Sequence, residues 1–163
     1  MWTKRQQWLH WMADEARKNG EPEDGAIILA LQAEWWKEKE DLDIIAKVIY
    51  HEADPQWCSW EHSVAVGAVV VNRRNSPYFP DTVKEVVAAP GQYLPAYTYH
   101  FSDTPTLCYK AAKAALDGDH YVPANAYWQA NSPQGTSIWK KFICDTGWFY
   151  SETYICCGIP GID

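Results

Sequence analysis

Apolar residues recur with a helical period between Asp41 and Ala53. The positions on this stripe are Leu42, Ile45, Ala46, Ile49 and Ala53, spaced i, i+3, i+4, i+7 and i+11. This spacing is typical of one face of an amphipathic helix. We expect the helix to begin with Asp41 as its N-cap and to end before Asp54-Pro55, because proline disfavours helical backbone in the residue that precedes it.

Three more helices are predicted downstream. Ser59 is placed to cap an almost wholly apolar segment, 60–73, which β propensity alone would also allow as a strand but whose length favours a helix. Thr82-x-x-Glu85 is a capping box that opens a short helix. Thr104 and Pro105 open a last helix, which ends at Gly118.

Beyond Gly118 the pattern changes to aromatic, β-branched and turn residues. The segments AYWQ, IWKKFIC, GWFYS and TYIC, at 126–129, 138–144, 147–151 and 153–156, predict short strands joined by turns. Helices followed by strands indicate an α+β fold, mostly helical with a small C-terminal antiparallel sheet.

The first forty residues predict two short helices, one ending near Gly20 and the next capped by Asp24. No Gly- or Ser-rich linker follows them. We therefore expect residues 1–40 to form a helical extension packed on a main domain of residues 41–163.

Composition narrows the possible functions. The chain has 163 residues, a formal charge of −7, ten Trp and ten Tyr. Without a basic patch, nucleic-acid binding is not expected. No apolar run reaches the ~18 residues of a membrane span, and residues 1–18 lack the apolar core of a signal peptide. The cysteine count is five, which is odd, so we expect structural or incidental thiols rather than a disulfide framework.

Glu52 is the first candidate for chemistry. It lies at the edge of the apolar stripe, just before the loop. A carboxyl held against apolar surface tends to keep its proton, because burial disfavours the charged form, and a general acid needs that proton. The alternative is a solvated residue in a last helical turn.

Two other chemistries compete. A zinc helix needs H-E-x-x-H, but His51-Glu52 is followed by Pro55. The spacing of His51, His62 and His100 does not require a metal, so no metal or cofactor is expected. Cys58 precedes a helix N-terminus and could serve as a nucleophile with His62 or His100 as its base.

Several motifs resemble the spore cortex-lytic enzyme and cell-wall hydrolase family, of the SleB and CwlJ type. They occur in the family's order between Leu42 and Cys157 and comprise Glu52-Ala53, Ala65-Val66, Val69, Asn72-Arg73, Phe79–Val83, Pro90–Tyr93, Ala126–Trp128, Asn131–Pro133, Ser137–Trp139 and Tyr154–Cys156. The chain departs from the family at His51, at 54–57 and at His62-Ser63, which replace G-E-A-R-G-E-P and Gly-Gln patterns.

The resemblance implies a lysozyme-like or transglycosylase-like domain that cleaves peptidoglycan between N-acetylmuramic acid and N-acetylglucosamine. It implies a lytic transglycosylase with Glu52 as its one catalytic carboxylate, or a muramidase. Two alternatives stay open: a non-catalytic Trp-rich wall- or coat-binding protein, and a thiol-dependent peptidoglycan amidase.

Polar and aromatic residues near these motifs are candidates for binding the glycan. They are Asn72, Gln92, Tyr93, Tyr127, Trp128, Ser137 and Trp139. The expected partner is a peptidoglycan glycan strand, with no nucleic acid, no membrane span and a monomeric protein. We expect synthesis in the cytoplasm and action on the cell wall or spore cortex after release or packaging.

Overall fold

The computed structural model describes residues 11, 14–15, 18–20, 23–93 and 104–162. The chain divides into two compact units, Met1–Glu40 and Asp41–Asp163. Helix α2, Glu23–Ala53, is continuous across this boundary. The predicted start at Asp41 is therefore wrong, because the Lys-Glu stretch before it favours helix and contains no breaker. The packing of residues 1–40 on the main domain stays a prediction.

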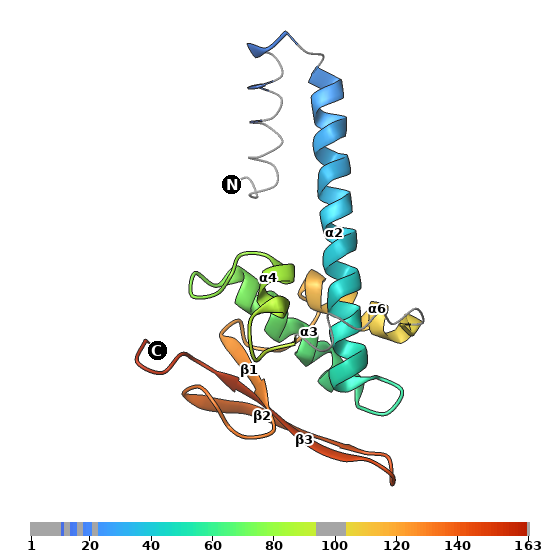
Figure 1. The fold of residues 1–163 in the computed structure, drawn as a ribbon, viewed down its shortest axis with the longest axis vertical. Coiled ribbons are helices and arrows are strands. Elements are labelled where there is room, and N and C mark those ends of the chain that lie inside the picture. The colour runs from blue at the N-terminus through green and yellow to red at the C-terminus, as the bar shows by residue number, and fades with distance from the viewer. Residues whose placement is uncertain (1–10, 12–13, 16–17, 21–22, 94–103, 163) are drawn as a thin grey trace. The chain divides into compact units, whose positions relative to one another are not determined.

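Over the described residues, three more helices and a sheet follow α2 (Figure 1). The elements are α3 (Trp60–Asn75), α4 (Val83–Ala88), α6 (Thr106–Asp117), β1 (Ala126–Ala130), β2 (Ser137–Asp145) and β3 (Tyr150–Cys157). Both strand pairs are antiparallel, in the order β1-β3-β2. The predicted α+β arrangement is confirmed. The segments GWFYS and TYIC are not two strands, because 150–157 form one continuous strand and 146–149 form the turn before it.

Two of the predicted N-caps, Ser59 and Thr82, are confirmed, whereas Asp24 and Asp41 lie within α2. The Ser59 hydroxyl accepts from the His62 amide at 3.2 Å, and Thr82 accepts from the Glu85 amide while donating to its carboxylate. Thr104 is not the cap of α6. Pro105 takes the cap position without a side-chain hydrogen bond, so that helix begins at Thr106.

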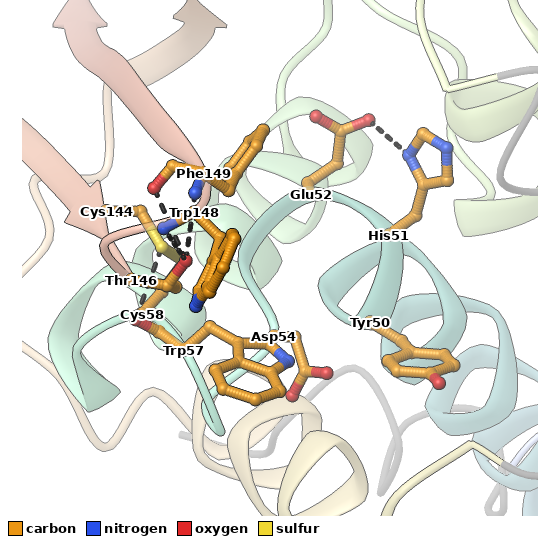
Figure 2. A pocket seen from close by; sticks show the side chains of 10 residues that line it. All are labelled: Tyr50, His51, Glu52, Asp54, Trp57, Cys58, Cys144, Thr146, Trp148 and Phe149. Atoms are coloured by element: carbon orange, nitrogen blue, oxygen red, sulfur yellow. Dashed lines mark hydrogen bonds and ion pairs between the residues drawn. A yellow bond between two sulfur atoms is a disulfide. The ribbon is translucent and has the colours of Figure 1, made fainter.

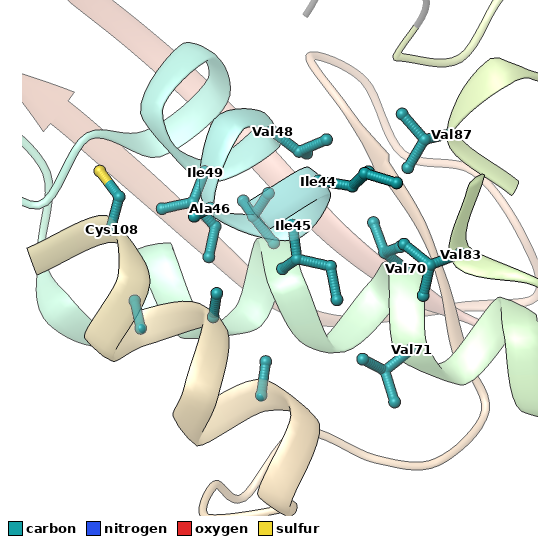
Figure 3. Packing of buried hydrophobic residues seen from close by; sticks show 14 of the residues in the cluster. Ile44, Ile45, Ala46, Val48, Ile49, Val70, Val71, Val83, Val87 and Cys108 are labelled. Atoms are coloured by element: carbon teal, nitrogen blue, oxygen red, sulfur yellow. The ribbon is translucent and has the colours of Figure 1, made fainter. Parts of the chain in front are cut away.

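Helix α3 lies at the centre of the main domain. Its residues from His62 to Arg73 are all buried, which explains the nearly continuous apolar sequence. One hydrophobic cluster joins it to the end of α2, to α4 and to α6 (Figure 3), and a second cluster joins it to the sheet. Gly67 permits the close approach of α6, since a Cβ there would lie 2.9 Å from the Cβ of Ala115.

None of the helices in the described part of the chain combines the length and apolar character needed to cross a bilayer.

Candidate functional site

Glu52 lies in a pocket at the C-terminal end of α2 (Figure 2). The pocket has a volume of about 520 Å³ and is lined by Tyr50, His51, Glu52, Asp54, Trp57, Cys58, Cys144, Thr146, Trp148 and Phe149. Figure 2 shows Glu52 and His51 on the end of the helix and the aromatic side chains of Trp148 and Phe149 on the hairpin between β2 and β3. The sequence pattern predicted the helical position of Glu52 but not this opposite wall.

Two side chains hold the Glu52 carboxylate. His51 Nδ1 lies 3.0 Å from Oε1, and Gln129 Nε2 donates to Oε2 at 3.3 Å. The Glu52 side chain keeps 30% of its exposure, so it is half-buried and open to the pocket. A carboxyl in this position can exchange a proton with a ligand while both oxygens are held in place.

The opposite wall is a hairpin turn with an aromatic tip. The Thr146 hydroxyl accepts from the backbone amides of Phe149 at 3.0 Å and Trp148 at 3.4 Å, and Gly147 adopts a positive φ of 81°. This turn leaves the Trp148 side chain 99% exposed and Phe149 59% exposed. Trp57, 63% exposed, adds a third ring from the loop after α2. Such rings can stack on the apolar faces of sugars.

A disulfide joins the two walls. Cys58 and Cys144 are bonded, with 5.0 Å between their Cα atoms and 86 positions between them in sequence. The expectation of structural or incidental thiols is therefore wrong for this pair. The odd count reflects one pair plus the buried free cysteines Cys108, Cys156 and Cys157. Sequence spacing could not reveal the pair, because the fold alone brings the loop and the strand together.

The predicted polar binding residues do not line the Glu52 pocket. Asn72 is buried, and its amide donates to the carbonyls of Pro123 at 2.8 Å and Ala126 at 3.1 Å, so it ties α3 to the start of β1. Gln92 is exposed and accepts a hydrogen bond from Arg73. Ser137 is exposed at the start of β2.

Two of the predicted aromatic residues, Tyr127 and Trp128, lie on β1 around Phe79. The ring centroids are 5.3 Å and 6.2 Å from that of Phe79. The Trp128 indole also donates to the carbonyl of Gly158 at 2.5 Å. These contacts are packing contacts within the main domain.

The other two predicted rings occupy different places. Tyr93 is 5% exposed within the helical core cluster, and a buried ring presents no face to a sugar. Its hydroxyl instead donates to Gln129 Oε1 at 3.1 Å. Trp139 lines a second pocket, of about 550 Å³, which shares no lining residue with the Glu52 pocket.

The competing chemistries find little support in this geometry. Cys58 is bonded to Cys144, so its sulfur is not a free nucleophile. His62 is buried against Phe142, and His100 lies outside the described residues. Within the described ranges, no three His, Cys, Asp or Glu side chains gather in a way that could hold a metal ion.

Asp54, the other carboxylate of the pocket, serves the loop. Its side-chain oxygen accepts from the backbone amide of Gln56 at 3.0 Å, a contact typical of a turn residue. Its backbone carbonyl accepts from the amides of Trp57 at 2.9 Å and Cys58 at 2.8 Å. The residue therefore sets the loop geometry that places Trp57 on the rim.

Comparison with known proteins identifies the family. The sequence profile of a family described as Cell Wall Hydrolase matches residues 58–150, more than half of the chain. The chain belongs to the cell wall hydrolase family. The matched segment runs from the disulfide cysteine Cys58 through the aromatic hairpin to Tyr150, and Glu52 lies just before it.

Two curated relatives of this family member are spore cortex-lytic enzymes. The protein from Oceanobacillus iheyensis is 34% identical over 103 residues, which cover 62% of this chain and 36% of the relative. The protein from Halalkalibacterium halodurans is 31% identical over 116 residues, covering 64% and 34%. The chain thus spans about a third of the length of these relatives.

A solved structure shares the fold. The catalytic domain of the germination-specific lytic transglycosylase SleB from Bacillus anthracis superposes with a TM-score of 0.50 at 26% sequence identity. The superposition covers 71% of this chain and 93% of that domain. This structural similarity supports the predicted lysozyme-like α+β class. It extends over almost the whole of the SleB catalytic domain.

Proposed function

We propose that this protein cleaves peptidoglycan glycan strands between N-acetylmuramic acid and N-acetylglucosamine, as a lytic transglycosylase that uses Glu52. One observation carries the proposal. In a member of the cell wall hydrolase family, a half-buried carboxylate opens into a pocket walled by exposed aromatic rings. The relatives named as spore cortex-lytic enzymes and a lytic transglycosylase support the same class of reaction.

The reaction needs one group that first gives a proton and then takes one. Protonated Glu52 donates to the glycosidic oxygen as the bond from C1 of the muramyl residue breaks, which releases the N-acetylglucosamine hydroxyl. The resulting carboxylate then accepts the proton of the muramyl C6 hydroxyl, whose oxygen bonds to C1. The product is a 1,6-anhydromuramyl end, Glu52 regains its proton, and no water is consumed.

The number of carboxylates in the pocket is better suited to a transglycosylase than to an enzyme that hydrolyses the glycan with water. Glycosidases that use water generally need a second carboxylate as base or nucleophile. Among the described residues, the pocket is lined by two acids, Glu52 and Asp54, and the Asp54 side chain is engaged with the amide of Gln56. A single catalytic acid therefore accounts for the chemistry, and a muramidase is the alternative.

Glu52→Gln tests the assignment. Because an amide cannot donate the required proton, the variant should release no soluble fragments from purified peptidoglycan. Its melting temperature should match that of the wild type, since the Glu52 side chain is open to the pocket. Digestion by the variant at the wild-type rate would contradict the proposal.

The other readings predict different signals. A thiol amidase would release free amino groups and lose activity with iodoacetamide. A non-catalytic wall-binding protein would bind peptidoglycan and release neither free amino groups nor 1,6-anhydromuramyl ends. We further propose that the protein acts as a monomer, on the cell wall or spore cortex, after release or packaging from the cytoplasm.

A further inference from the structure

We infer that Gln129 and Tyr93 form a positioning pair that orients the Glu52 carboxylate and stabilises its negative charge during cleavage. This inference rests on the proposed function of Glu52. The sequence motifs gave no sign of a link between these residues and Glu52, since Gln129 is 77 positions away along the chain. The fold brings the three side chains together from α2, from the segment after α4 and from β1.

The hydrogen bonds run in one direction. The Tyr93 hydroxyl donates to Gln129 Oε1 at 3.1 Å, and Gln129 Nε2 donates to Glu52 Oε2 at 3.3 Å. An amide has one accepting and one donating end. Because Tyr93 occupies the accepting end, the Gln129 NH₂ group is directed at the carboxylate.

Both partners are fixed by their surroundings. Tyr93 is 5% exposed, and burial raises the pKa of its hydroxyl to about 12, so it remains a donor at any pH near neutrality. Gln129 is half-buried on β1, where its backbone pairs with Ile155 of β3. The pair therefore presents its donor to Glu52 without reorganisation when the substrate binds.

The donor matters most after Glu52 has released its proton. The acid step converts a neutral carboxyl into a carboxylate, and a hydrogen bond to Oε2 grows stronger as that charge develops. His51 Nδ1, 3.0 Å from Oε1, approaches the other oxygen. Gln129 thus favours the charged state that forms in the transition state, and Tyr93 acts through Gln129.

Three variants test the pair. Gln129→Met keeps the length of the side chain without its amide, Tyr93→Phe removes only the hydroxyl, and the third variant combines the two. We expect Gln129→Met to lower kcat about tenfold with little change in KM, as a lost hydrogen bond to a charged group implies. Tyr93→Phe should lower kcat about threefold. The double variant should be no slower than Gln129→Met alone, because Tyr93 acts only through the amide.

The pH dependence separates positioning from a structural role. Loss of a donor to a carboxylate favours its protonated form, so the alkaline limb of the kcat profile should move to higher pH in all three variants. Tyr109→Phe is the matched control. It removes a similar bond, from the Tyr109 hydroxyl to Asp43 at 2.6 Å, nine positions before Glu52 on α2, and should leave kcat and its pH profile unchanged.

The outcomes also separate this inference from the proposed function. If the wild type does not cleave peptidoglycan at all, the proposed function fails. If the wild type cleaves but Gln129→Met and Tyr93→Phe retain its kcat and pH profile, only the positioning pair is refuted. Additive losses in the double variant would likewise contradict an action of Tyr93 through Gln129.

Discussion

At the scale of single residues, the nearly complete exposure of Trp148 leaves its ring free to stack on a ligand. A large apolar ring left in water gives up the free energy of burial, and the Thr146 turn holds it at the pocket rim. We predict that Trp148→Ala weakens glycan binding by about 1–3 kcal/mol, by analogy with other stacked aromatic rings.

The same substitution should leave the melting temperature unchanged, because the ring makes little contact with the fold. Tyr121→Ala is the matched control, since Tyr121 is 95% exposed but lies outside the Glu52 pocket. Affinity for a chitin oligosaccharide, measured by calorimetry with both variants, checks the prediction. Equal losses in the two variants would remove Trp148 from the binding surface.

A second residue-scale prediction concerns the buried His62. Its ring stacks on Phe142 with 4.8 Å between centroids, and neither ring nitrogen has a hydrogen-bond partner. Burial lowers the pKa of His62 from its ordinary 6.5 to about 4. As the pH falls below 6.5, the unfolded state therefore takes up a proton before the folded state does, and stability decreases until about pH 4.

Urea unfolding checks this direction. The free energy of unfolding should fall by about 2–3 kcal/mol through His62 between pH 7 and pH 4.5. His62→Phe, which keeps an aromatic ring but does not titrate, should lose that share of the pH dependence. An equal pH dependence in the variant and the wild type would show that His62 does not supply it.

Residue-scale features of this site were the hardest to predict from sequence. The pattern placed Glu52 at a helix end beside apolar surface, but it could not tell which aromatic rings face solvent. Tyr93 became a core residue and Trp148 a rim residue because burial depends on which elements pack against them. In the sequence, the one signal for an exposed aromatic tip was the glycine of this hairpin turn, Gly147, which lies between aromatic segments.

At the scale of elements, the Cys58–Cys144 disulfide fixes the loop after α2 to the end of β2. It closes a long segment of chain, so it restricts the unfolded state strongly, by about 3–5 kcal/mol. We predict that replacing both cysteines by serine lowers the free energy of unfolding by this amount. Binding of glycan should also weaken, because the hairpin that carries Trp148 is no longer anchored to the opposite wall.

Reductant supplies the control for this prediction. Dithiothreitol should reproduce both effects in the wild type and should change nothing in the double serine variant. Thiol labelling of the unfolded wild type without reductant should count three cysteines. Labelling of all five would contradict the disulfide.

Elements with strong local signals were predictable. Ser59 and the Thr82-Glu85 box fixed two helix starts, because a cap satisfies backbone amides wherever the helix packs. The predicted helix start at Asp41 was wrong, because an aspartate inside a run of good helix formers can form a side-chain contact instead of a cap. In the structure Asp41 accepts from Arg74 at 3.2 Å.

At the scale of the whole molecule, helices that precede a small sheet predicted the α+β class. The site depends on contacts that only this assembly creates. Gln129 reaches Glu52 from β1, and the aromatic hairpin is joined to the loop that follows the acid. Sequence motifs indicated the class of reaction, whereas the aromatic wall of the pocket could be recognised only once the fold was known.

The central claim is that Glu52 cleaves glycan strands without consuming water. Purified peptidoglycan is digested with the wild type in heavy-oxygen water, and the new muramyl ends are analysed by mass spectrometry, with Glu52→Gln as the control. The account predicts 1,6-anhydromuramyl ends that carry no heavy oxygen and that are absent from the control digest. Reducing muramyl ends that carry heavy oxygen would show hydrolysis and contradict it.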